Sequence, residues 1–393
     1  MKERPLGRSF HVMRKKTRIC LYVVLISAIF LPWFAWETDR NMVRRWAYPI
    51  TGHLSALSTR CDAHAPSWLQ ELARQLPTRL DSPANQLVFV DKAGSRSGCV
   101  NGWERYPLVS QRVTPGSNFR LASLSKIVTF FGVVHGQADW LNQPLAAVLD
   151  LGPPFRDPHI AQIQIRHLLN HSAGFDRMRA EDPMVINDKK PWCPGQVQEL
   201  AQAQLQFTPG SRHAYSNLGY CLAAVAYERH AGRSLWSALE QDMRLSQYGI
   251  GYMDQADSPL AYNFMHNELH GPEFVEHFDW QALRAPMGMT GSAEGLARFI
   301  ADNRPLLDRS RGMHDSSIPC NETVPESCQD GFLERRRVGD QQVWLQRGYL
   351  YGMSALFLSD DAGNFIVWLG AGDVGQPLRA SEFIERAFLK GFH

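Results

Sequence analysis

The pattern of apolar and polar positions divides the chain into one long apolar run near its start and a series of shorter segments. Residues 19–36 carry no charged side chain, and a helix of that length just crosses a hydrocarbon core of ~30 Å. Farther along, apolar residues three to four positions apart predict helices, and short apolar runs between turn residues predict strands. The predicted helices span residues 67–76, 124–135, 165–170, 218–231, 292–300 and 382–389, and the predicted strands 86–90, 342–345, 356–358 and 365–369.

The order of these elements predicts the fold class. One strand precedes a mostly helical region at about 140–300, and three strands and a closing helix follow it. Strands near the two ends of a chain with helices between them are typical of an α+β domain that carries a helical insertion. We therefore expect the N-terminal and C-terminal strands to build one sheet together.

The charges before the apolar run predict its orientation in a membrane. Residues 1–18 carry seven lysine and arginine side chains against one glutamate, an excess that keeps a segment in the cytoplasm. The sequence predicts a cytoplasmic segment at 1–18, a transmembrane anchor in the inner membrane at 19–36, a stalk at 37–65 and a periplasmic or extracellular domain at 66–393. A cleaved signal peptide, which would leave the domain secreted, has the same layout. No clear small-x-small cleavage site follows the run, which favours the anchor.

Composition and cysteine content narrow the class of protein. Of 393 residues 44% are hydrophobic and 20% charged, with a formal net charge of +2, which is typical of a globular protein and gives no reason to expect a nucleic-acid partner. Six cysteines outside the apolar run permit disulfides in an oxidising compartment. Cys320 and Cys328 flank a short polar loop and are the best predicted pair, whereas Cys221 is equally consistent with a buried free thiol. Zinc is not expected, because no C-x-x-C pair is present.

Ser123 and Lys126 are the first candidates for catalytic chemistry. They are three residues apart at the start of an apolar helical run, so hydroxyl and amine lie on one helix face. A serine becomes a strong nucleophile only when a base removes its proton, and burial lowers the pKa of a lysine enough for it to be that base. In isolation the same spacing also fits a helix-capping serine beside a lysine that extends to solvent.

Three further blocks follow the Ser123 region in order. Residues 163–175 read IQIRHLLNHSAGF, residues 208–220 read TPGSRHAYSNLGY and residues 287–299 read MGMTGSAEGLARF. Together with FRLASLSK at 119–126, they resemble the serine β-lactamase and penicillin-binding-protein superfamily, in the branch of class C β-lactamases, D-alanyl-D-alanine carboxypeptidases and related esterases. The resemblance implies an α/β sandwich in which an antiparallel sheet is flanked by helices and carries an inserted all-helical subdomain.

The resemblance also implies roles for individual residues. Ser123 would be the nucleophile, Lys126 and Tyr215 would transfer its proton, and Asn217 would help to place the substrate. No metal or organic cofactor is implied. Without the resemblance, Tyr215 would be a half-buried aromatic residue and Asn217 a helix cap.

The third motif of the superfamily is altered in this chain. The superfamily carries Lys-Thr-Gly or a His-x-Gly variant on a strand beside the site, and the matching residues here are Gln346, Arg347 and Gly348. Gly348 matches the small position that lets substrate approach the strand, and Tyr349 would give a backbone oxyanion donor. Gln346 replaces the cation, which weakens the expectation of efficient β-lactam or D-Ala carboxylate recognition. Arg347 is an alternative carboxylate ligand, although neighbouring strand residues point to opposite faces.

The sequence therefore predicts an exported serine hydrolase that forms an acyl-enzyme at Ser123. Its partner would be a small-molecule or peptidoglycan-derived substrate: a D-Ala peptide, a β-lactam, or an ester or amide. The alternatives are a catalytically inactive binding protein of the same fold and a structural envelope protein. Two lesser features are interpreted as solvated loops. One is the segment with His266, His270 and His277, and the other is the basic run 335–337, for which a contact to an anionic envelope is an alternative.

Overall fold

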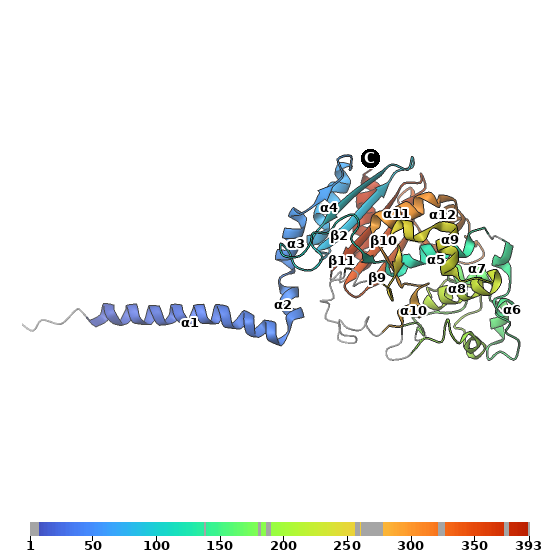
Figure 1. Ribbon diagram of the computed structural model, residues 1–393, viewed down its shortest axis with the longest axis horizontal. Coiled ribbons are helices and arrows are strands. Elements are labelled where there is room, and N and C mark those ends of the chain that lie inside the picture. Colours follow the sequence, from blue (N-terminus) through green and yellow to red (C-terminus); the bar gives the residue numbers. More distant parts are fainter. Residues whose placement is uncertain are drawn as a thin grey trace, which may run out of the picture.

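The computed structural model describes residues 8–136, 139–179, 182–185, 190–255, 260, 278–320, 327–372 and 377–391. A long helix, α1 (Arg8–Thr38), extends away from a body of helices and strands (Figure 1). Within the described residues, Cys20–Thr38 is the one helical stretch long and apolar enough to cross a membrane. The apolar run expected at 19–36 therefore forms part of a single continuous helix.

The body is built on an eight-stranded antiparallel sheet with the strand order β1-β3-β2-β11-β10-β9-β8-β7. Each strand hydrogen-bonds to its neighbour in the antiparallel sense. The strands are β1 (Arg60–Cys61), β2 (Ala84–Val90), β3 (Arg96–Asn101), β7 (Ser327–Asp330), β8 (Leu333–Val338), β9 (Gln341–Leu350), β10 (Met353–Asp360) and β11 (Phe365–Ala371). Because β2 pairs with β11 along its whole length, the expectation that the two ends of the chain share one sheet is confirmed.

Helices cover both faces of this sheet. On one face, α4 (Ser67–Arg79) and α13 (Pro377–Lys390) pack their apolar sides onto the strands. On the other face lies a larger core that includes α5 (Ser125–Val134) and α11 (Ala293–Asp302). Every residue of β2, β10 and β11 is buried, because a sheet covered on both faces leaves neither side of its central strands in water.

The helical region expected at about 140–300 is present and contains short strands as well. It includes α6 (Leu145–Val148), α7 (Ile165–Leu169), α8 (Asn217–Ala231), α9 (Leu235–Met243) and α10 (Trp280–Leu283), and α12 (Arg304–Arg311) follows it. Two of its segments, β5 (Gly251–Tyr252) and β6 (Met289–Gly291), join β4 (Phe119–Arg120) in a three-stranded sheet. This small sheet places residues 289–291 beside the segment that leads into Ser123.

The segment expected to be a stalk, residues 37–65, has regular structure of its own. It contains α2 (Arg40–Trp46) and α3 (Tyr48–Leu57), and it ends in the edge strand β1. The pairing of β1 with β3 is reinforced by a disulfide between Cys61 and Cys99. The last residues of this segment are therefore part of the main sheet.

The remaining disulfides test the cysteine predictions. Cys320 pairs with Cys328, as the short loop between them predicts. Cys193 pairs with Cys221, so the alternative of a free thiol at Cys221 is wrong. Cys221 lies on α8, and its partner Cys193 lies in the segment before that helix. The apolar helical pattern around Cys221 does not by itself distinguish a free thiol from a disulfide-bonded cysteine.

The basic run 335–337 is not a solvated loop. It lies in β8, where Arg336 is buried and forms an ion pair with Glu385 of α13 at 3.1 Å. Arg335 pairs with Asp330 of β7 at 3.2 Å. The interpretation as a loop is wrong because charged residues enter a strand when a carboxylate across the sheet or on the covering helix compensates them.

Candidate active site

Ser123 lies in a single 3-10 turn, Ala122–Leu124, immediately before α5. The residue before it, Ala122, has a φ of 47°, which is the left-handed region that non-glycine residues rarely adopt. Strained backbone of this kind persists where the surrounding packing holds it, and it is common at functional sites. The turn directs Ser123 Oγ out of the helix toward residues from two other parts of the chain.

Lys126 is fully buried on the first turn of α5. Its Nζ lies 3.5 Å from Ser123 Oγ, 2.8 Å from the Oδ1 of Asn217 and 2.8 Å from the carbonyl oxygen of Pro286. Burial lowers the pKa of Lys126 well below its usual value, and the nearby Arg177 guanidinium lowers it further, while Asp182 acts in the opposite direction. The environment of Lys126 therefore shifts it toward the neutral amine, the form that can accept a proton.

Tyr215 completes the arrangement around the serine. Its hydroxyl donates a hydrogen bond to Ser123 Oγ at 2.6 Å. Its ring lies beside Lys126, whose Nζ is 4.6 Å from the ring centroid. Burial raises the pKa of Tyr215 to about 12, although its hydrogen bond to Ser123 acts to lower it. Tyr215 therefore keeps its proton at neutral pH and can deliver it to, or recover it from, the serine oxygen.

Asn217 positions Lys126 rather than contacting Ser123 directly. It is the first residue of α8, buried, and follows the N-cap Ser216. Its Oδ1 accepts from Lys126, and its Nδ2 donates to the Asp182 carboxylate at 2.7 Å. The two partners have opposite hydrogen-bonding character, so they fix which end of the amide faces the lysine.

His171 supports Tyr215 from behind. The two rings have their centroids 4.6 Å apart, and His171 Nδ1 accepts the backbone N–H of Ser216 at 3.2 Å. Burial lowers the pKa of His171 well below its ordinary value. A neutral imidazole whose Nδ1 accepts a hydrogen bond carries its proton on Nε2. His171 is thus a neutral, buried ring that holds Tyr215 and the start of α8 in place.

The third motif lies on β9, next to Ser123. Gln346 is buried, and its Nε2 donates to the carbonyl oxygen of Ser123 at 3.2 Å. Gly348 lies against the same turn, where a Cβ atom would come within 2.9 Å of the Leu121 carbonyl oxygen. Arg347 points to the other face of the sheet, where it pairs with Glu334 and donates from Nε to Ser381 Oγ at 2.8 Å.

The edge of β9 beside Ser123 is open within the described strands. Pairing with β8 ends where Leu345 meets Glu334, whereas pairing with β10 continues to Leu350. The stretch from Gln346 to Leu350 therefore has a strand on one side only. An open edge offers backbone N–H and C=O groups to an extended ligand.

These residues line a cavity of about 430 Å³ that opens at the nucleophile. Ser123, Tyr215 and Gln346 line it at the nucleophile, and Arg177 lies in its wall. The lining residues are Ser123, Arg177, Tyr215, Gln329, Glu334, Leu345, Gln346, Arg347, Tyr349 and Leu378. Five of the eight sequence-predicted site residues thus line this cavity, and the other three, Lys126, Asn217 and Gly348, lie behind the lining.

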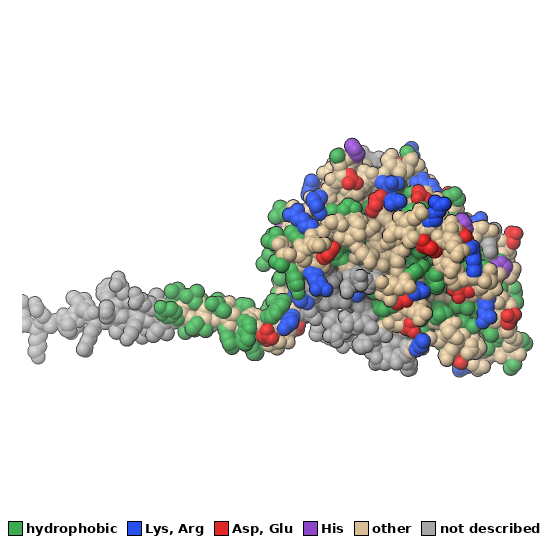
Figure 2. All heavy atoms as spheres, viewed as in Figure 1, with side chains coloured by type: hydrophobic (Ala, Val, Ile, Leu, Met, Phe, Trp, Pro, Cys, Tyr) green, Lys and Arg blue, Asp and Glu red, His purple; other side chains and the backbone are tan. Residues whose placement is uncertain are grey.

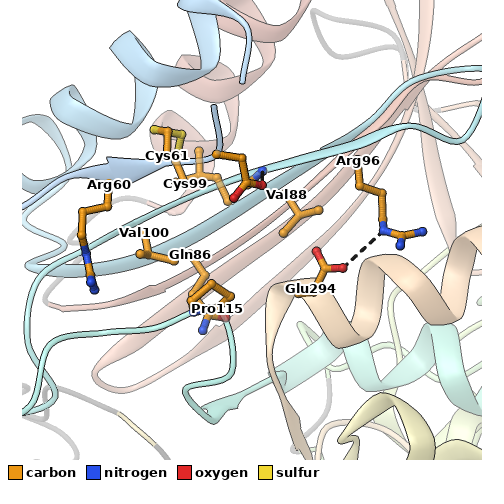
Figure 3. A pocket seen from close by; sticks show the side chains of 12 residues that line it. Arg60, Cys61, Gln86, Val88, Arg96, Cys99, Val100, Pro115 and Glu294 are labelled. Carbon is orange, nitrogen blue, oxygen red and sulfur yellow. Dashed lines mark hydrogen bonds and ion pairs between the residues drawn. A yellow bond between two sulfur atoms is a disulfide. The ribbon is translucent and has the colours of Figure 1, made fainter. Parts of the chain in front are cut away.

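A second cavity of about 510 Å³ lies at the far edge of the sheet (Figure 3). Its lining contains no serine, lysine or tyrosine. Its two carboxylates already have partners, because Asp62 accepts the Gly98 N–H at 2.7 Å and Glu294 pairs with Arg96 at 3.3 Å (Figure 3). The cavity at Ser123 is therefore the one with the groups that covalent catalysis requires.

Two residues of the site were not predicted from the sequence. Arg177 and Asp182 come from the segment after HSAGF, which has no helical or strand periodicity. Arg177 stacks on the Tyr215 ring with its guanidinium 4.5 Å from the centroid. The one feature of the sequence that could have indicated Arg177 and Asp182 is that they follow the HSAGF block.

The described part of the chain contains no group of three or more His, Cys, Asp or Glu residues placed to hold a metal ion. The segment with His266, His270 and His277 lies outside the described residues.

Fold and site together define the class of protein. A serine with a buried lysine one helical turn later and a tyrosine hydrogen-bonded to its oxygen, on a helix-covered antiparallel sheet, characterises the serine hydrolases of the β-lactamase and penicillin-binding-protein superfamily. The chain belongs to the Beta-lactamase family, whose model matches residues 99–332. The predicted superfamily and fold class are therefore confirmed.

Curated relatives and solved structures extend this comparison. The chain is 30% identical to a probable fimbrial assembly protein FimD, serogroup H1, of Dichelobacter nodosus, over 89% of this chain and 90% of that protein. A putative FimD of serogroup D from the same organism is 31% identical, over 90% and 91%.

Solved structures share the fold at lower identity. A β-lactamase/D-alanine carboxypeptidase from Yersinia pestis has a TM-score of 0.65 at 16% identity, covering 84% of this chain and 98% of that one. The D-amino acid amidase from Ochrobactrum anthropi SV3 has a TM-score of 0.63 at 18% identity, covering 83% and 97%.

Proposed function

We propose that this protein is an exported serine hydrolase that forms an acyl-enzyme at Ser123. The observation that carries the proposal is the position of Ser123 Oγ, 2.6 Å from the Tyr215 hydroxyl and 3.5 Å from Lys126 Nζ. A proton donor and a proton acceptor thus flank one nucleophilic oxygen, as general acid–base catalysis of acyl transfer requires.

Lys126 Nζ has three oxygen neighbours. Asn217 Oδ1 and the Pro286 carbonyl, both at 2.8 Å, accept two N–H groups, and Ser123 Oγ at 3.5 Å occupies the third position. An ammonium would donate a third hydrogen bond to Ser123 Oγ, whereas a neutral amine has only two N–H groups and directs its lone pair at the serine hydroxyl. Because burial lowers the pKa of Lys126, we take the neutral amine as the base.

The reaction then follows from these contacts. Lys126 Nζ takes the proton of Ser123 Oγ, directly or through the Tyr215 hydroxyl, as the oxygen attacks the substrate carbonyl. The tetrahedral intermediate collapses, the bond to the leaving group breaks, and the proton passes to the leaving group. Water next attacks the acyl carbon and loses a proton to the same pair. The bond between the acyl carbon and Ser123 Oγ breaks, the carboxylic acid product leaves, and the pair returns the proton to Ser123 Oγ.

The backbone around Ser123 is suited to stabilise the oxyanion. We place the N–H of Ser123 and that of Tyr349 on the open edge of β9 as its two donors. Gly348 supports this role, because its lack of a side chain lets β9 lie close to the Leu121 carbonyl. Donors fixed in this way stabilise developing charge without reorganisation.

We further propose that the acyl donor carries an anionic group, as a D-Ala peptide or a β-lactam does. Gln346 supplies no charge, and Arg347 is committed to Glu334 and Ser381. Arg177 lines the cavity, is exposed, and has no carboxylate partner among the described residues. It is therefore the cation that best replaces the missing third-motif lysine or histidine.

Covalent labelling tests the nucleophile. A fluorophosphonate and a fluorescent penicillin should both form adducts that peptide mass spectrometry assigns to Ser123, and Ser123→Ala should abolish both. Ser211→Ala is the matched control, since Ser211 is exposed and lies outside the cavity lining. Labelling that survives Ser123→Ala would refute the proposed nucleophile.

A second candidate function is suggested by the names of the curated relatives, which are fimbrial assembly proteins. In that case the fold would serve fimbrial assembly by binding, without turnover. Restoration of fimbriae by Ser123→Ala in a strain that lacks the chain would favour binding. Failure of Ser123→Ala, with rescue by Ser211→Ala, would place the hydrolase within the assembly process.

A further inference from the structure

Helix α3 leaves two large apolar side chains in solvent. The side chains buried against the body are Tyr48, Gly52 and Ser55, whereas Ile50 and Leu57 are 68% and 85% exposed. Gly52 allows close packing on α4, since a Cβ atom there would lie 2.8 Å from the Pro77 carbonyl oxygen. A surface helix in water normally turns its apolar side inward, so the exposed side of α3 is suited to an apolar environment.

Neighbouring residues extend this exposed apolar side. Trp46 at the end of α2 is 68% exposed, and Leu108 and Val109 in the loop after β3 are 72% and 85% exposed. We call Trp46, Ile50, Leu57, Leu108 and Val109 the apolar ledge. Scattered apolar residues are ordinary on protein surfaces, but a set gathered on adjoining elements marks an interaction surface.

Arg44 of α2 connects the loop after β3 to the end of α1. Its guanidinium donates to the Tyr106 hydroxyl at 2.8 Å and lies 5.4 Å from the centroid of the Trp36 ring. The loop that carries Leu108 is thereby tied to α2 and to the last turn of α1. The apolar ledge is thus continuous with the helix that is apolar enough to cross a membrane.

The direction of the helices places the ledge on the side from which α1 departs. In Figure 1, α1 leaves the body along its own axis, while α2 and α3 turn away and run across that side of the body. Figure 2 shows hydrophobic side chains along the same side, over α3. A bilayer crossed by α1 would therefore present its surface to this side.

We propose that the apolar ledge lies in the interfacial layer of the membrane that α1 crosses, so that the catalytic body rests on the lipid surface. The inference relies on the proposed export of the body and on α1 as an uncleaved anchor. Exposed apolar side chains enter the boundary between headgroups and acyl chains, and tryptophan favours that layer. Arg40 and Arg45 of α2 pair with Glu37 and Asp39 at 3.8 Å. Together with Arg44 they leave a net positive charge at the level of the lipid phosphates, which attracts anionic lipids.

Site-specific photocrosslinking tests this surface. The photoreactive residue p-benzoylphenylalanine replaces Trp46, Ile50, Leu57 or Val109 in the full chain, held in nanodiscs of phosphatidylethanolamine and phosphatidylglycerol. Lipid adducts are expected at each position by intact-mass spectrometry. Position 33, within the predicted span, is the positive control, and position 229, exposed on α8, is the negative one. Thermal unfolding like that of the unmodified chain shows that each variant is folded.

Two outcomes would overturn the proposal. One is lipid adducts at position 33 with none at the ledge positions, which means that the ledge faces water. The other is adducts at the ledge positions with a second polypeptide in place of lipid. Neither result depends on Ser123 labelling, so failure of this inference and failure of the proposed hydrolase activity are distinguishable.

Discussion

The side-chain amide of Asn217 accepts a hydrogen bond from Lys126 at 2.8 Å. The other end of that amide is held by the Asp182 carboxylate at 2.7 Å. Lys126, the proposed base, is thereby coupled through the neutral Asn217 amide to the Asp182 carboxylate. Its protonation is set by three environments: burial, Arg177 and Asp182.

We expect Asp182→Asn to move the acidic limb of the pH profile to lower pH. The carboxylate of Asp182 acts to raise the pKa of Lys126, so removing its charge lowers that pKa. Lys126 then loses its proton, and becomes a base, at lower pH. The pH dependence of acylation kcat/KM checks this, and an acidic limb that moves upward would contradict the assignment of Lys126 as the base. Asn retains an oxygen to accept from Asn217, so the geometry is conserved.

Arg177→Gln should have the opposite effect on pH and a selective effect on substrate. Arg177 lowers the pKa of Lys126, so its removal moves the acidic limb to higher pH. Loss of a charge-assisted hydrogen bond costs roughly 10-fold or more in acylation by a penicillin, while a neutral ester should lose far less. Arg179→Gln is the control, because Arg179 pairs with Asp176 outside the cavity lining. Equal losses for both substrates would remove Arg177 from substrate recognition.

Tyr215→Phe should slow acylation by about 10²–10⁴-fold, the range for loss of a positioned proton-transfer group. The variant keeps the ring that packs against His171 and loses only the hydroxyl at 2.6 Å from Ser123. Stopped-flow labelling with a fluorescent penicillin measures the rate. Because the pKa of Tyr215 is about 12, a basic limb below pH 10 in the native enzyme should persist in Tyr215→Phe. A rate close to that of the native enzyme would limit Tyr215 to a packing role.

Gly348→Val tests the close approach of β9 to the nucleophile. A side chain there meets the Leu121 carbonyl oxygen at 2.9 Å and the Ala355 Cβ at 3.0 Å. We expect β9 to move away from the turn before Ser123 and acylation to fall ~10²-fold, since displacements of about 1 Å carry costs of that size. Gly339→Val, in the β8–β9 turn, is the control for introducing a valine near this strand. A Cβ atom there meets nothing within 4 Å, and the φ of 60° at this position adds backbone strain. Equal acylation rates for native enzyme and Gly348→Val would contradict the proposed oxyanion site.

Removing the Cys193–Cys221 disulfide should cost more stability than removing Cys320–Cys328. The two bonds close loops of different length, with sequence separations of 28 and 8. Chain entropy predicts about 3.6 kcal/mol for the first and about 2.5 kcal/mol for the second. Urea unfolding of the two double alanine variants measures the difference in the free energy of unfolding. The reverse order would show that strain or packing, and not loop closure, dominates.

Much of the fold could be predicted from periodicity. The predicted helix at 124–135 corresponds to α5, and the strand at 365–369 lies within β11, because both are long apolar runs with clear boundaries. β5 and β6 were not predicted, since strands of two or three residues are too short for periodicity. The helices in 37–65 were also missed. Trp46, Ile50 and Leu57 of these helices are exposed, so their apolar residues do not mark a side that faces the core.

The site residues that could be predicted from the sequence are those that belong to a motif. Ser123 and Lys126 share one turn, and Tyr215 and Asn217 stand together before α8, so spacing identifies them. Arg177 and Asp182 reach the same cavity from an irregular segment whose path is determined by tertiary packing. No local pattern encodes that path, which is why the charges that set the pKa of Lys126 became visible only in the structure.

The central position of β11 has a consequence for when the site around Ser123 can form. β11 lies between β2 and β10, although it follows almost all of the chain in sequence. A chain that emerges N-terminus first cannot close the sheet until residues 365–371 have arrived, so β2 and β3 wait as a hairpin without their inner neighbour. The contact of Gln346 with Ser123 also depends on strands made late. If the chain is exported as proposed, a half-translocated polypeptide would lack the complete site, and Ser123 would gain its full surroundings only after translocation.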